Sequence, residues 1–115
     1  MSVPVTLDEL PEQIERFGPH AYVVTVGEDG RPRATSVSVS WHNQALLKFG
    51  AGRRTAANVG GNDQVALLWP APVPGEHALL VDGWGTVHDS PQTGDTVVFI
   101  QPAKAVLHVT TPARV

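Results

Sequence analysis

The strongest constraint on the fold is a strict alternation of apolar and polar residues over positions 33–41, RATSVSVSW. The two valines and Trp41 fall on one face of an extended chain, and the three serines fall on the other. A period of two residues is typical of a half-buried antiparallel strand. The preceding run 20–27 is rich in aromatic and β-branched types, and a Gly-containing turn at 28–30 joins the two runs. Together they predict a β-hairpin.

Further short strands are predicted wherever apolar runs are bounded by turn residues. They cover residues 45–50, 64–70, 77–89, 96–101 and 103–109. Pro102 separates the last two, because proline cannot donate to a strand ladder. Gly83 and Gly85 predict a bulge or bend in the long strand, and the neighbouring Asp82 is interpreted as part of that bulge.

Two helices are predicted. In residues 6–17 the apolar side chains recur at helical spacing, Thr6 and Glu9 fit a capping box, and Gly18 supplies the end. Pro11 conflicts with one continuous helix, so the segment forms either two short turns or a helix that starts near Pro11. Residues 55–59 can form about two turns before a pair of glycines ends them.

The chain is therefore expected to be mainly β, a closed antiparallel barrel of six or seven strands with an N-terminal helix and one short interior helix. Its 115 residues fit a single domain, residues 1–115. Closure of the barrel removes exposed sheet edges. Trp41, Trp69 and Trp84 are assigned to the core or a dimer interface, with a planar cofactor as an alternative neighbour.

Composition argues against several classes of protein. There is no cysteine, so disulfides and thiolate metal sites are excluded and a cytoplasmic location is expected. The formal net charge of −3 without a basic stripe argues against nucleic-acid binding. The chain contains no apolar run long enough to span a membrane, and its first residues do not resemble a signal peptide. The five histidines are scattered without ligand spacing, so no metal site is expected.

The segment GAGRRTAAN, residues 50–58, has the composition of a phosphate site. Gly50 and Gly52 allow close approach of a ligand, and the first turn of the following helix offers free N–H groups. Arg53 and Arg54 add permanent charges with planar donor forks, and Thr55 adds a hydroxyl. The alternative is a Gly-rich turn with two solvated arginines.

The two common nucleotide loops do not match this segment. The Walker pattern requires Gly-Lys-Ser/Thr, whereas the chain has Gly52-Arg53-Arg54-Thr55. The dinucleotide pattern requires a third glycine where Thr55 stands, and the flanking strands are expected to be antiparallel.

In the order of their motifs along the chain, residues 6–109 resemble the pyridoxamine 5′-phosphate oxidase-like family of flavin- and deazaflavin-binding split barrels. An amphipathic helix is followed by TVGEDGRPRATSV, then LLKFGAGRRTAANV, QVALLWP and VDGWGTV, in the order of the family's first hairpin, phosphate motif and later strands.

The resemblance implies a homodimeric split barrel that holds FMN at its interface and acts as an oxidoreductase on a small-molecule substrate. It places the ring system along the second strand and the phosphate at the short helix. The cofactor-binding residues carried over are Thr35, Ser36, Val37, Ser38, Phe49, Gly50, Arg53, Arg54, Thr55 and Asn58. No catalytic residue is assigned.

Two departures from the family pattern widen the choice of function. Thr55 stands where the family commonly has lysine, which leaves the deazaflavin coenzyme F-420 or haem as alternatives to FMN. The chain has no counterpart of the C-terminal segment that helps bind pyridoxamine phosphate, so oxidation of that substrate is not expected. A carrier or sensor without turnover is a further alternative.

Overall fold

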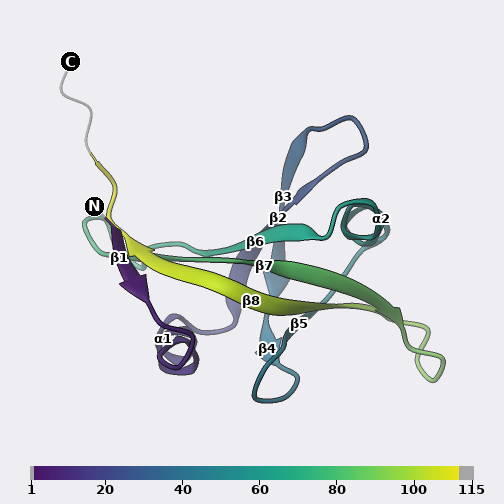
Figure 1. The fold of residues 1–115 in the computed structure, drawn as a ribbon, viewed down its shortest axis with the longest axis horizontal. Helices are drawn as coiled ribbons and strands as arrows, with labels where there is room; N and C mark the ends of the chain where they lie inside the picture. The colour runs from purple at the N-terminus through teal and green to yellow at the C-terminus, as the bar shows by residue number, and fades with distance from the viewer. Residues whose placement is uncertain (1, 112–115) are drawn as a thin grey trace.

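The computed structural model describes residues 2–111 and contains one antiparallel sheet of eight strands and two helices (Figure 1). The strands are β1 Ser2–Val5, β2 His20–Val26, β3 Pro32–Ser38, β4 Ser40–Trp41, β5 Leu47–Gly50, β6 Gln64–Trp69, β7 Ala78–Asp89 and β8 Thr96–His108. The helices are α1 Leu10–Phe17 and α2 Arg53–Gly61. Neither of these helices has the length and apolar character needed to cross a bilayer, among the residues that are described.

The two ends of the sheet are connected by the chain and not by a strand ladder. The strand order is β3-β2-β6-β7-β8-β5-β4, with β1 added to β8. The two strands at the ends of this path, β3 and β4, are consecutive in sequence and are separated only by Val39. The Val39 N–H donates to the Pro19 carbonyl oxygen at 2.8 Å, which holds the crossing point against the start of β2. The mainly β, barrel-like fold predicted from the sequence is confirmed.

The core fills the inside of this barrel. Along β7 the inward positions are Leu79, Val81, Gly83 and Gly85, while Trp84 points outward. A Cβ at Gly83 would lie 2.5 Å from the Gln101 carbonyl oxygen. The register also shifts between Asp82 and Gly83, where Ala103 of β8 is left without a partner on β7. A bulge therefore lies at the predicted place, but its extra residue belongs to β8 and not to the strand that carries the two glycines.

Trp69 is the largest fully buried side chain, and its indole N–H donates to the Gly18 carbonyl oxygen at 2.9 Å. This bond joins the end of α1 to the core. Leu10 and Ile14 pack the helix onto the same core, and the Gly18 N–H donates to the Ile14 carbonyl oxygen to close the last turn.

The helix predicted over 6–17 is shorter than expected, because α1 begins at Leu10 with Pro11 in its first turn. Proline is tolerated there, since its missing N–H would have no partner in the helix. Thr6 and Glu9 do exchange the hydrogen bonds of a capping box, but around a turn before the helix. Of the two alternatives that Pro11 left open, a start near Pro11 is the correct one.

The prediction of two strands at 96–101 and 103–109 is wrong, because β8 runs unbroken through Pro102. On one edge of β8, the β5 ladder ends at Ile100 and the β1 ladder begins at Ala105. Pro102 lies in the gap between them, where no ladder partner needs its missing N–H. The seven predicted runs become eight strands, because this merger removes one while the unpredicted β1 and the division of the run 33–41 at Val39 add two.

Candidate functional site

Helix α2 starts with unsatisfied donors. Gly52, at its N-cap, is extended (φ −74°, ψ 173°) and provides no side-chain cap. The Ala56 N–H closes the first turn by donating to the Gly52 carbonyl oxygen at 3.0 Å. The N–H groups of the three residues before Ala56 therefore have no partner within the helix, and the helix dipole makes this end attractive to an anion.

A cleft of about 760 Å³ lies between α2 and the β2–β3 hairpin. Figure 1 shows the hairpin projecting beyond the barrel with α2 beside it. Two elements far apart in sequence thus form the two walls. The lining residues are Gly27, Glu28, Asp29, Arg31, Pro32, Arg33, Arg54 and Asn58.

The turn of the hairpin is held by a compact set of hydrogen bonds. The Gly27 N–H donates to the Arg31 carbonyl oxygen and the Gly30 N–H to the Gly27 carbonyl oxygen, both at 2.9 Å. The Asp29 Oδ1 accepts the Arg31 N–H at 3.1 Å. Gly30 has φ +81°, which a residue with a side chain rarely adopts. The backbone that carries Arg31 and Arg33 is therefore well defined.

The charge of the cleft is mixed but favours anions. Arg31 and Arg33 come from the hairpin and Arg54 from the first turn of α2, against the two carboxylates of Glu28 and Asp29. Three guanidinium groups present planar donor forks that suit phosphate oxygens. A cleft of this size and charge can hold a phosphorylated organic ligand.

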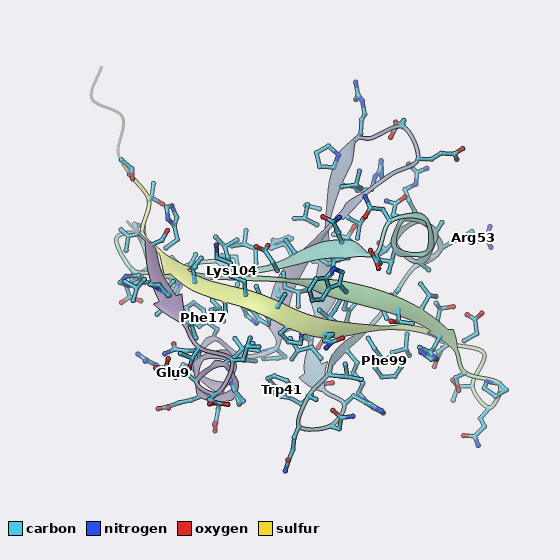
Figure 2. All side chains as sticks on the ribbon, in the orientation of Figure 1. Glu9, Phe17, Trp41, Arg53, Phe99 and Lys104 are labelled. Carbon is cyan, nitrogen blue, oxygen red and sulfur yellow. The ribbon has the colours of Figure 1, made fainter. Side chains whose placement is uncertain are left out.

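The structure distributes the predicted residues of α2 over different environments. Arg54 and Asn58 line the cleft. Arg53 is exposed, and Figure 2 shows it on the flank of α2 that faces away from the hairpin. Thr55 is buried, with 5% of its surface exposed, so its side chain packs toward the barrel.

The predicted ring segment lies apart from this cleft. Ser36, Val37 and Ser38 line a second groove of about 450 Å³ together with His20, Ala21, Tyr22 and Pro70. Thr35 precedes them on the same exposed strand, β3. In the single chain, the groove and the cleft lie at the two ends of β3.

The last two predicted residues end strand β5. The Phe49 side chain belongs to the core, whereas Gly50 is exposed, and a Cβ added to it would meet nothing within 4 Å. The single chain therefore does not gather all ten predicted residues into one pocket.

Sequence reasoning missed Gly27, Arg31 and Arg33 as lining residues of the cleft. A signal was present, because Arg31-Pro32-Arg33 follows the hairpin turn directly and precedes the ring segment. Only the packing of the hairpin beside α2, about 20 residues later, shows that these arginines face the same space as Arg54.

Comparison with known proteins rests on structure, because no family model and no curated protein matches the chain. An F420 reductase superposes with a TM-score of 0.66 at 18% identity, covering 76% of this chain and 90% of its own. A protein related to general stress protein 26, of the pyridoxinephosphate oxidase family, from Clostridium acetobutylicum, gives 0.70 at 14% identity and 91% of each chain. HutZ, the haem storage protein of Vibrio cholerae, gives 0.63 at 14% identity, covering 89% and 94%.

These likenesses extend over most of each chain, at identities that establish the fold alone. The single antiparallel sheet and the two helices described above are consistent with the split barrel that the sequence resemblance implied. The chain therefore has the fold of the pyridoxamine 5′-phosphate oxidase-like proteins, as the ordered motifs predicted.

Proposed function

We propose that the chain binds FMN through a phosphate held in the cleft between α2 and the β2–β3 hairpin, and that it acts as a small flavin-dependent oxidoreductase. The observation that carries this proposal is the convergence of Arg31, Arg33 and Arg54 on one cleft of about 760 Å³. Cofactor pockets commonly measure about 300–1,000 Å³, so the space suits a ligand larger than a bare phosphate.

A bound flavin would supply the redox chemistry, which the side chains of this protein cannot provide. The arginines would hold its phosphate, and the exposed polar face of β3 would offer Ser36 and Ser38 as hydrogen-bonding partners along the ring segment. The proposal keeps four further predicted residues around the phosphate end of the flavin, namely Arg53, Thr55, Phe49 and Gly50.

A homodimer is part of the proposal, because the outer face of the sheet carries a row of apolar residues beside the charged pair Asp82 and Lys104. Tyr22, Leu68, Leu80 and Val106 are successive cross-strand partners on β2, β6, β7 and β8. Tyr22 is 43% exposed, and Trp84 on the same face is 50% exposed. Contiguous apolar surface of this kind is typical of an interface.

The ring segment adjoins this apolar row. Tyr22 pairs with Ser36 on β3, so the groove along β3 lies at the edge of the face that a second chain would cover. The partner chain could therefore complete the ring site that the single chain leaves open.

The test is to purify the protein, record its visible spectrum and titrate FMN by fluorescence quenching, with light scattering to give the oligomeric state. We expect a dimer that binds FMN with micromolar affinity or better. A colourless protein that does not bind added FMN would contradict the flavin proposal, and a monomer would contradict the proposed interface.

Coenzyme F-420 is the second candidate, favoured by the fold shared with an F420 reductase and by a cleft lined by three arginines. Its long anionic tail would gain more from those charges than FMN does. Parallel titrations with FMN and the deazaflavin distinguish the two cofactors. If the deazaflavin binds more tightly, it becomes the proposed cofactor in place of FMN.

A carrier or sensor without turnover is the third candidate, and the fold shared with a haem storage protein makes haem its test ligand. Binding without redox turnover in the presence of common electron donors would favour it. A cytoplasmic location and a small-molecule substrate remain part of the leading proposal.

A further inference from the structure

Thr25 is a polar residue in an apolar position. It lies on the inner face of β2, where Ala21 and Val23 belong to the core, and only 2% of its surface is exposed. Within residues 2–111, Thr25 and Thr55 are the two buried polar side chains. Valine would fill this position without a hydroxyl, so the hydroxyl requires a reason.

The hydroxyl of Thr25 is bonded to the wall of the cleft. The Asn58 Nδ2 of α2 donates to the Thr25 Oγ1 at 3.1 Å, across 33 residues of sequence. Asn58 is partly exposed and lines the cleft, whereas Thr25 does not. The bond therefore joins the barrel interior to a residue of the candidate site.

The other end of the Asn58 carboxamide is directed at the hairpin. A Cβ placed on Gly27 would lie 3.6 Å from the Asn58 Oδ1 and 3.1 Å from the Asp29 Oδ1. Asn58 thus lies between the sheet, which fixes its nitrogen, and the hairpin, which its oxygen approaches.

We propose that Thr25 is a positioning residue of the ligand site: its buried hydroxyl fixes the Asn58 carboxamide and, through it, the position of α2 relative to the hairpin. This inference rests on the proposed function for the identity of the ligand, FMN. Thr25 would not contact FMN, and its effect would pass through Asn58 and the placement of Arg54.

The experiment compares Thr25→Val, which removes the hydroxyl and keeps the shape, with Thr25→Ser, which keeps the hydroxyl. Thr86→Val, at an exposed position on β7, is the matched control. FMN dissociation constants and urea unfolding midpoints are measured for each. We expect Thr25→Val to weaken FMN binding about fivefold to tenfold, the effect of one lost hydrogen bond.

The same comparison separates positioning from a merely structural role. Thr25→Ser should bind within about twofold of the wild type, and the urea midpoint of Thr25→Val should stay close to it, because valine is favoured in buried strands. Unchanged FMN affinity in Thr25→Val, or equal losses in Thr25→Val and Thr25→Ser, would overturn the inference.

Amide hydrogen exchange, measured on the protein without ligand, tests the role of Thr25 independently of whether the protein binds FMN. Thr25→Val should speed amide exchange in α2 while leaving α1 unchanged, and Thr25→Ser should restore the slow exchange. If the wild type binds no FMN, the proposed function fails, while faster exchange in α2 would still support Thr25 as its anchor. Unchanged exchange in α2 would overturn the anchor as well.

Discussion

The barrel interior and the cleft differ in how their residues are held. Leu67, Val81 and Ile100 are fully buried and are fixed by packing from every side. Arg31, Arg33 and Arg54 are exposed, and the hairpin turn and the start of α2 fix their backbone. Strand β2 belongs to both regions, because its inner residues fill the core and its end leads into the cleft. Stability and ligand binding should therefore respond to different substitutions.

The largest effect is expected from the two tryptophans on opposite faces of the sheet. Trp69→Ala should lower the free energy of unfolding by about 3–5 kcal/mol, because it removes a fully buried ring and the hydrogen bond to Gly18. Trp84→Ala, at a half-exposed position, should cost about 1 kcal/mol or less in dilute protein. Urea unfolding measures both, and equal losses would contradict the division between the two faces.

A second pair of variants tests the bulge inside the barrel. Gly83→Ala should destabilise the fold by about 1–3 kcal/mol, because the new methyl group would meet the backbone of Gln101. Gly60→Ala is the matched control, since nothing lies within 4 Å of its Cβ position on α2. It should stabilise the helix by about 0.5–1 kcal/mol. If Gly83→Ala leaves the free energy of unfolding in urea unchanged, β7 and β8 can separate at this point without loss of stability.

In the cleft the expected changes are in affinity. Arg54→Ala should weaken FMN binding about 10- to 100-fold, the loss expected for charge-assisted hydrogen bonds, with little change in the urea midpoint. Arg53→Ala, on the flank of α2 that faces away from the hairpin, should lose clearly less. Calorimetric titration checks both. Equal losses of FMN affinity in the two variants would indicate that the phosphate binds at the end of α2 and not in the cleft.

The smallest effect is the pH dependence contributed by Glu9. The backbone N–H and the hydroxyl of Thr6 both donate to its carboxylate, and these bonds lower the pKa of Glu9 below its ordinary value. The stabilisation is therefore complete above the pKa of an unfolded glutamate and is lost as pH falls through the lowered folded pKa.

Glu9→Gln removes this charge, so the wild type should lose its small advantage over the variant as urea unfolding is taken from pH 7 to pH 3. Glu15→Gln, at an exposed position on α1, is the control. A difference between wild type and Glu9→Gln that stays constant over this range would contradict the assignment.

Local patterns predicted much of the fold. The alternation at 33–41 predicted the exposed serines and the buried Val39. The interior helix was predicted at 55–59, whereas α2 runs from Arg53 to Gly61, so the two glycines form its last turn and do not follow it. The sequence failed where pairing is distant. Strand β1 has four residues including a proline, and only its ladder with β8 makes it a strand.

The candidate site follows the same rule. Arg54 was predicted from the chemistry of the helix motif and Asn58 from the family resemblance, and both line the cleft. Arg31 and Arg33 could be identified as lining residues only from the packing of the hairpin beside α2. Thr25, which does not line the cleft, could be linked to it only from its bond to Asn58. Side chains brought together by tertiary packing leave little trace in a sequence pattern.

The pairing of β1 with β8 also has a consequence for synthesis. Ser2 and His108, which are bonded through their side chains, lie 106 positions apart in the chain. During synthesis β1 cannot pair with β8 until residues 105–108 have left the ribosome. Contacts this distant slow folding, so the N-terminal segment should be the last to gain protection in a refolding experiment.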